Sequence, residues 1–207
     1  MNIVLSDLEK DAFSEIFNVG VGHAAASLSQ MVGQEVELSI PVVEIMDRHQ
    51  AVLLLDSNQT TNITGIKEKF SGSFDGEALL LFPEESSMEL VRLLLSEDLP
   101  LDVLSEMEQE ALTEVGNIIL TGCLSSLADM LQEEISNDLP VFSQGDADSL
   151  LKCNESEQKE STVMFLKTMF NIQEKNIQGY VTFLMDLEGM GLFRKKVASL
   201  FGMEMES

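Results

Sequence analysis

Two stretches of the chain repeat one another, and this duplication constrains the fold more than any other feature. Residues 5–43 align with residues 104–142 without a gap, and 12 of the 39 aligned pairs are identical. Two units are too few for an open solenoid, so each unit has to bury its apolar face against the other. We therefore predict a single domain made of two repeats, about 1–100 and 101–207, related by a pseudo-two-fold axis.

A helix is expected at the start of each repeat. Ser6 is followed by Glu9, and Ser105 by Glu108, at the spacing of a capping box. Beyond these caps, apolar residues recur at helical spacing: Leu8, Ala12, Ile16 and Val19 in the first repeat, and Met107, Ala111, Val115 and Ile118 in the second. The pattern allows the first helix either to run unbroken or to break near Gly20 and Gly22.

Strands and a second helix are expected in the rest of each repeat. Pro41 and Pro140 mark the passage into extended chain. Apolar runs predict strands at 51–56, 78–82, 162–170 and 180–185, and helices at 84–95 and 187–200. The polar stretch 143–161 is expected to be a mobile loop. The predicted fold class is α+β, with long first helices packed on a β-sheet.

Composition disfavours several classes of function. The formal net charge is −24, from 36 acidic and 12 basic residues, which repels nucleic acid and anionic membranes. Without a signal-peptide pattern or an apolar run of spanning length, we expect a cytoplasmic protein with no membrane insertion. Cys123 and Cys153 form no CxxC pair, and His23 and His49 have no partner at ligand spacing. A zinc or di-iron site on the helices is therefore disfavoured.

A polar stripe runs along each first helix. On a helical wheel, Asp11, Glu15 and Asn18 share one side, next to the predicted buried face. A single Glu-x-x-Asn is ordinarily solvated helix surface. However, Asn inside a helix costs about 0.65 kcal/mol relative to Ala, and the second repeat keeps the same pair as Glu114 and Asn117, preceded by Glu110. The stripes are therefore candidate functional sites.

A carboxylate beside a carboxamide suits the hydrolysis of a phosphoryl group on another protein. A carboxamide can accept a hydrogen bond from a water and donate one to a phosphoryl oxygen, which places the water for in-line attack. A carboxylate accepts hydrogen bonds only, so it can dock a cationic residue of a partner.

The spacing of the stripes and the prolines carries a family resemblance. The pattern Asp11-x3-Glu15-x2-Asn18-x22-Pro41 resembles the motif of the CheC, CheX and FliY chemotaxis phosphatases. It recurs at the same spacing from Glu110 to Pro140, and two copies are most similar to CheC. The likeness extends to the strand GEALLLFP and the helix after it. The family usually has Asp or Ser at the first motif position, so Glu110 departs from the pattern.

The resemblance implies a hydrolase that dephosphorylates the phospho-aspartate of a CheY-type response regulator. Asn18 and Asn117 would orient the attacking water, and Glu15 and Glu114 would engage the active-site Lys of the regulator. Asp11 and Glu110 are possible accessory positions. The regulator would bring Mg²⁺, so no cofactor would be bound by this chain.

Further partners, the oligomeric state and two alternative functions complete the expectations. The CheD deamidase is a possible second partner, and a monomer is expected because the duplication itself supplies a two-fold axis. Two alternatives stay open. One is a non-catalytic adaptor or binding module of the chemotaxis or flagellar switch apparatus, as FliM-like relatives are. The other is an unrelated α+β domain whose motif spacing is coincidental.

Overall fold

The computed structural model describes residues 5–56, 62–95, 106–152, 161–172 and 175–203 of the 207. The order helix, two strands, helix, two strands, helix occurs twice along the chain. The first set is α1 (Asp7–Val32), β1 (Val36–Leu38), β2 (Val42–Asp47), α2 (Arg48–Asp56), β3 (Ile63–Gly72), β4 (Gly76–Pro83) and α3 (Glu84–Leu95). The second set is α4 (Glu106–Leu131), β5 (Ile135–Asn137), β6 (Val141–Gly145), α5 (Ala147–Leu150), β7 (Ser161–Ile172), β8 (Lys175–Asp186) and α6 (Leu187–Leu200). The predicted boundary between the repeats, near residue 100, lies outside the described residues.

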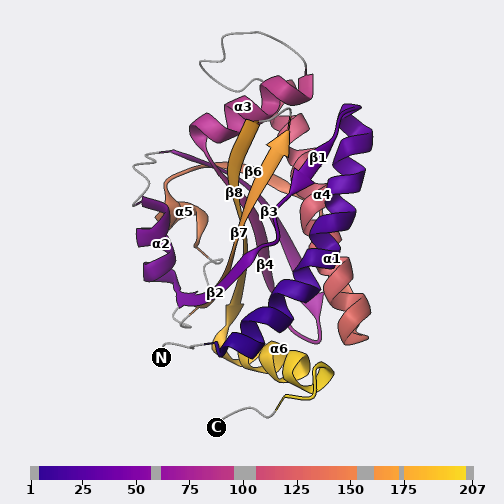
Figure 1. The fold of residues 1–207 in the computed structure, drawn as a ribbon. Coiled ribbons are helices and arrows are strands. Elements are labelled where there is room, and N and C mark those ends of the chain that lie inside the picture. Colours follow the sequence, from indigo (N-terminus) through magenta and orange to yellow (C-terminus); the bar gives the residue numbers. More distant parts are fainter. Residues whose placement is uncertain (1–4, 57–61, 96–105, 153–160, 173–174, 204–207) are drawn as a thin grey trace.

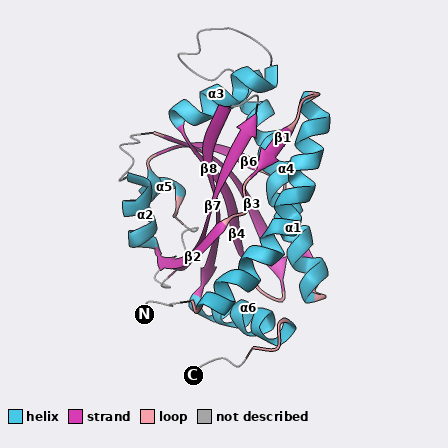
Figure 2. Ribbon diagram, viewed as in Figure 1, coloured by secondary structure: helices cyan, strands magenta, loops and turns pink. Residues whose placement is uncertain are grey.

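The strands form one antiparallel sheet in which the two repeats exchange their short strands (Figure 2). The main path runs β1-β7-β8-β4-β3-β5. The first repeat's β1 and β2 both pair with β7 of the second, and the second repeat's β5 and β6 both pair with β3 of the first. Because main-chain hydrogen bonds of each repeat are completed by the other, the halves depend on one another. The predicted α+β class is confirmed.

Helices cover both faces of the sheet (Figure 1). The larger apolar core lies on the face covered by α1 and α4, and α3 and α6 also contribute to it. A smaller core lies on the opposite face, where Ala51 and Leu55 of α2 and Leu150 of α5 are buried. The central strand β4 therefore has both faces covered, which explains its nearly continuous apolar run.

Helices α1 and α4 pack directly against each other. The Ser126 hydroxyl donates to the carbonyl oxygen of Ile16 at 2.9 Å. A Cβ added at Gly20 would lie 2.6 Å from the carbonyl oxygen of Gly122 and 2.9 Å from the Cα of Cys123, so this close backbone approach requires glycine. Partner numbers fall along α4 as they rise along α1, which means that the two helices run antiparallel.

Several predicted helix boundaries are confirmed. The capping box is present at the start of α1, where the amide of Glu9 donates to Ser6 Oγ at 3.3 Å and the amide of Ser6 donates to Glu9 Oε2 at 2.8 Å. The helix runs unbroken through Gly20 and Gly22 and ends at Gly33, whose φ of 68° is the left-handed cap that glycine favours. The predicted helices 84–95 and 187–200 match α3 and α6. Ser105, in the second capping pattern, lies outside the described residues.

One prediction of local structure was wrong, and a second was wrong for those of its residues that the structure describes. Residues 51–56 belong to helix α2 rather than to a strand. The helix starts from a reciprocal cap, in which Gln50 N donates to Asp47 Oδ1 at 2.8 Å and Asp47 N donates to Gln50 Oε1 at 3.3 Å. The stretch 143–161 is not a single loop, because it includes the end of β6, helix α5 and the first residue of β7. Residues 153–160 lie outside the described part.

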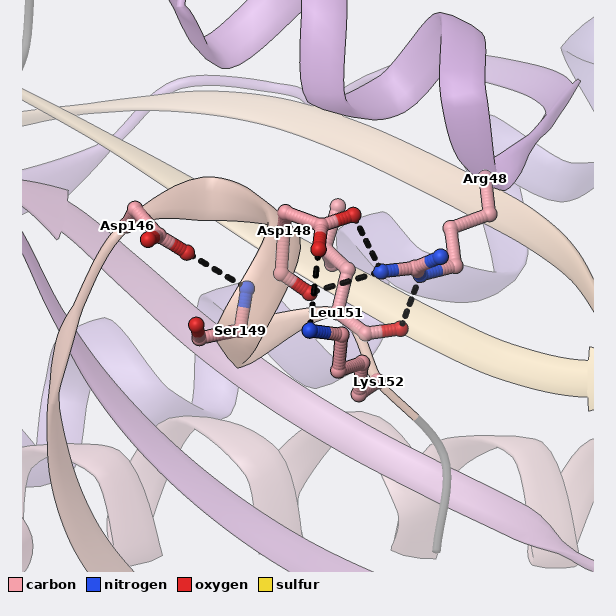
Figure 3. A network of polar contacts seen from close by, with 6 residues as sticks. All are labelled: Arg48, Asp146, Asp148, Ser149, Leu151 and Lys152. Atoms are coloured by element: carbon pink, nitrogen blue, oxygen red, sulfur yellow. Dashed lines mark hydrogen bonds and ion pairs between the residues drawn. The ribbon is translucent and has the colours of Figure 1, made fainter. Parts of the chain in front are cut away.

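A polar network joins the two repeats on the face opposite α1 and α4 (Figure 3). The guanidinium of Arg48, at the start of α2, donates to Asp148 Oδ1 at 2.5 Å and to the carbonyl oxygen of Leu151 at 3.1 Å. Asp146 caps α5 by accepting from the amide of Ser149 at 2.7 Å. These contacts fix α2 against α5. The candidate sites lie on the other face of the sheet, on α1 and α4.

Among the described helices, α4 passes the length and composition test for a membrane span, although the sequence patterns predicted no such segment. Half of the apolar window is buried inside the protein, against α1 and the sheet.

Candidate functional site

The two polar stripes lie at the surface of α1 and α4. Each stripe has the same exposure pattern: the carboxylates are exposed and the amide is half-buried, for Asp11, Glu15 and Asn18 as for Glu110, Glu114 and Asn117. Residues three and four apart share one face of a helix, so each amide lies next to its Glu. Because the two helices run antiparallel, the stripes lie toward opposite ends of the pair.

The predicted buried face of α1 was partly wrong. Leu8 is 69% exposed and Val19 38% exposed, whereas the aromatic residues Phe13 and Phe17 are fully buried. The large rings turn the helix toward the sheet, since they remove the most apolar area from water. The stripe of Asp11, Glu15 and Asn18 consequently lies nearly opposite the buried face rather than beside it. His23 is exposed as well.

In the first repeat, a hydrogen bond holds the motif proline against α1. The Ser14 hydroxyl donates to the carbonyl oxygen of Pro41 at 3.2 Å. Within the described part of the chain, neither Glu15 nor Asn18 has a hydrogen bond or ion pair through its side chain. Both groups are therefore available to a partner molecule.

In the second repeat, the amide is held by its surroundings. The Thr121 hydroxyl, one turn further along α4, donates to Asn117 Oδ1 at 3.4 Å. The amide nitrogen of Asn137, at the end of β5, contacts Thr121 Oγ1 at 3.5 Å and donates to Glu68 Oε2 at 3.1 Å. Glu114 has no side-chain partner among the described residues. The second site therefore leaves its carboxylate available while orienting its amide.

Glu68 is a buried carboxyl group on β3, beneath the second site. Its side chain is fully buried, and Oε1 has no hydrogen-bond partner among the described residues. Burial raises the pKa of Glu68 to about 7, although the hydrogen bond from Asn137 acts in the opposite direction.

Exposed apolar residues recur at the same places in both repeats. In the first repeat Leu8 is 69% exposed, Ile40 63% and Val42 61%, and their counterparts Met107, Leu139 and Val141 are 60%, 86% and 58% exposed. Leu8 and Met107 precede the stripes by one turn, and the other four residues flank the motif prolines. Each candidate site thus combines an exposed carboxylate and an amide with apolar neighbours, a composition suited to binding a protein surface.

No group of three or more His, Cys, Asp or Glu side chains suited to a metal ion occurs among the described residues. The residues of the stripes can position a water and a partner, which are the tasks that their chemistry predicts.

No family model matches the sequence, but named proteins are similar to it. The CheY-P phosphatase CheC of Bacillus subtilis is 22% identical over 142 residues, which cover 67% of this chain and 68% of CheC. The flagellar motor switch phosphatase FliY of the same organism is 24% identical over 138 residues, 66% of this chain but only 35% of FliY.

Solved structures share the fold. FliY from Thermotoga maritima matches with a TM-score of 0.76 and 17% identity, covering 96% of this chain and 100% of that one. The middle domain of FliM from H. pylori matches with a TM-score of 0.65 and 12% identity, over 93% and 99% of the two chains. A CheX–CheY–BeF3–Mg²⁺ complex from Borrelia burgdorferi matches with a TM-score of 0.52 and 19% identity, over 83% and 97%.

The chain is thus similar in sequence to CheC and FliY, and it shares its fold with FliY, FliM and CheX. Sequence reasoning missed two sets of residues. The exposed apolar residues had a signal, because Ile40 and Leu139 occupy equivalent positions beside the motif prolines. Thr121 and Asn137 had none, because the first repeat has Gly22 and Leu38 in their places.

Proposed function

We propose that this protein is a phosphatase that hydrolyses the phospho-aspartate of a CheY-type response regulator in chemotaxis signalling. The observation that carries the proposal is the presence of an accessible Glu and Asn on the outer side of each of two antiparallel helices. The relative named CheY-P phosphatase CheC supports this activity, and the complex of CheX with CheY supports a receiver domain as the partner.

Asn18 and Asn117 orient the attacking water in this proposal. The carboxamide oxygen accepts a hydrogen bond from the water, and the amide nitrogen donates to a phosphoryl oxygen. The water oxygen then attacks phosphorus and the bond between phosphorus and the aspartyl oxygen breaks. Inorganic phosphate leaves with the protons of the water, and the aspartate side chain of the receiver is left as a free carboxylate. Such a loose transition state needs placement more than a strong base, and placement can contribute several of the about 7 to 11 kcal/mol available from proximity.

Glu15 and Glu114 dock the regulator. Both are exposed and have no side-chain partner within the described part of the chain, so each can accept the active-site Lys of a receiver domain without breaking an existing contact. Asp11 and Glu110, one turn before them, extend the acidic stripe as accessory positions. The exposed apolar residues beside the motif prolines supply the neutral part of the docking surface.

The remaining parts of the proposal concern the cofactor, the assembly and the location. Mg²⁺ comes with the receiver domain, and this chain binds no cofactor of its own. The protein acts in the cytoplasm as a monomer, because exchange of short strands between its two repeats already completes the sheet. The deamidase CheD is a possible further partner.

The test is the lifetime of a phosphorylated CheY-type receiver domain with the purified protein present in less than stoichiometric amount. We expect every receiver molecule to be dephosphorylated faster than in the absence of the protein, which requires turnover. A receiver that binds the protein but decays at its own rate would refute the phosphatase proposal.

A second candidate, a non-catalytic adaptor of the chemotaxis or flagellar switch apparatus, is favoured by one observation. The FliM middle domain shares the fold over nearly its whole length. Docking alone, however, does not require a water-placing amide in both repeats. The same lifetime experiment separates the two candidates, because an adaptor binds the receiver without turnover.

A further inference from the structure

We propose that Thr121, Asn137 and Glu68 are positioning residues for Asn117, so that the second site holds its amide ready before the receiver binds while the first site does not. This inference rests on the proposed phosphatase function. It assigns a role to three residues that lie outside the repeated motif, and it makes the two sites unequal.

Asn137 donates both inward, to Glu68, and outward, to Thr121, and from Thr121 the donation continues outward to Asn117. Asn137 uses its amide hydrogens toward Glu68 Oε2, at 3.1 Å, and toward Thr121 Oγ1, at 3.5 Å. With its oxygen accepting from Asn137, the Thr121 hydroxyl has its single hydrogen free for Asn117 Oδ1, at 3.4 Å. The two outer links, at 3.4 and 3.5 Å, are longer than the inner link between Asn137 and Glu68, at 3.1 Å.

This direction fixes which end of the Asn117 carboxamide faces the protein. Its oxygen lies toward Thr121, so its nitrogen has both hydrogens free for a phosphoryl oxygen. The oxygen keeps a second lone pair, which can accept from the attacking water. Without the Thr121 hydroxyl, the amide could rotate and exchange the two roles.

Glu68 anchors the inner end of the connection. It is fully buried on β3, and it accepts a hydrogen bond from the Asn137 amide. The sheet fixes the distance between them, because β5 pairs with β3 and places Asn137 opposite Phe70, two residues from Glu68. The position of Asn137 is therefore set by backbone pairing and does not depend on a flexible loop.

The first repeat has no equivalent connection. Gly22 and Leu38 occupy the places of Thr121 and Asn137. Leu38 pairs with Phe170 on β7 as Asn137 pairs with Phe70 on β3, so Thr168 occupies the place of Glu68. The Thr168 hydroxyl donates to the carbonyl oxygen of Ser39 at 3.1 Å and not toward α1. Asn18 must consequently be ordered by the receiver itself, and this ordering costs conformational entropy.

The experiment measures each site alone. In an Asn18→Ala background only the second site works, and Thr121→Val should lower kcat by about two- to tenfold, the factor that one ordinary hydrogen bond contributes. KM should stay within about twofold, because the docking carboxylate Glu114 is untouched. Thr121→Ser keeps the hydroxyl and should restore kcat. Thr113→Val is the matched control, because this threonine of α4 bonds only its own helix, at Gln109 O, 2.7 Å.

Two results would overturn the inference. One is an unchanged kcat for Thr121→Val in the Asn18→Ala background. The other is an equal loss in the Asn117→Ala background, where the first site alone works, because this would indicate a general effect on the fold.

A second measurement does not depend on activity. The side-chain amide signals of Asn117 in a ¹H–¹⁵N NMR spectrum should differ from those of a free amide, and Thr121→Val and Asn137→Leu should each move them toward the position of Asn18. Signals that stay in place in both variants would refute the hydrogen-bonded connection. If the native protein shows no phosphatase activity, the proposed function fails, and the NMR result still decides whether Asn117 is held.

Discussion

Replacing Glu68 by Gln should change how the stability of the protein depends on pH. Burial raises the pKa of this carboxyl from its ordinary 4.5 to about 7, against the opposing effect of the Asn137 hydrogen bond. The folded state therefore binds the Glu68 proton more tightly than the unfolded state. Stability contributed by this proton is fully present below about pH 4.5, is lost as the pH rises, and is gone above about pH 7.

The size of the effect follows from the same two values. Each pH unit between them corresponds to about 1.36 kcal/mol, so the free energy of unfolding should fall by about 3 kcal/mol between pH 4.5 and 8 because of Glu68 alone. Gln has nearly the same shape and cannot ionise. It also places an amide where Glu68 Oε1 has no described partner, and the resulting cost does not vary with pH.

Urea unfolding of both proteins at several pH values from 5 to 8 measures this effect. We expect the stability of Glu68→Gln relative to the native protein to rise by about 2.5 kcal/mol across the range. Glu134→Gln, on an exposed side chain, is the control and should show a constant difference. A constant difference for Glu68→Gln as well would refute the account of a buried carboxyl group that takes up a proton near neutral pH.

Three further predictions concern the two sites and the helix pair. Asn18→Ala and Asn117→Ala should each lower the rate of receiver dephosphorylation and neither should abolish it; a completely inactive Asn18→Ala protein would show that the second site is silent. Gly20→Ala should lower the free energy of unfolding in urea by about 1–3 kcal/mol because its Cβ would meet the α4 backbone, whereas Gly22→Ala, whose Cβ meets nothing within 4 Å, should raise it by up to about 1 kcal/mol. Equal effects of the two substitutions would contradict the helix crossing. Leu139→Ser should raise KM for the phosphorylated receiver and leave kcat and stability unchanged, since this side chain is 86% exposed; an unchanged KM would remove it from the docking surface.

Local sequence signals predicted the helices α1, α3, α4 and α6 and the strands β4, β7 and β8. The start of α3 could be predicted from the acidic residues of its first turn, and the start of α6 from the Asp that caps it. The strands β7 and β8 were recognisable as long apolar runs. The repeat can be recognised by aligning the sequence with itself, without knowledge of distant contacts. It indicated that the two halves fold together.

The remaining features depend on tertiary contacts. In the strand exchange, β1 pairs with β7, and the paired residues Val36 and Ile172 are more than 130 positions apart in the sequence. No local pattern encodes such a pairing. β3 was missed because Lys67, Glu68 and Lys69 interrupt its apolar pattern, although the sheet buries Glu68. The hydrogen-bond partner of Glu68 could not be predicted from the sequence, because Asn137 reaches it only through the pairing of β5 with β3.

The most direct measurement of the proposed mechanism is receiver dephosphorylation by a protein that carries both Asn18→Ala and Asn117→Ala. The account predicts that this variant still binds a BeF3-activated CheY-type receiver domain, through Glu15 and Glu114, and no longer accelerates the loss of phosphate. A variant that accelerates dephosphorylation as fast as the native protein would contradict the assignment of the two amides as the groups that place the attacking water.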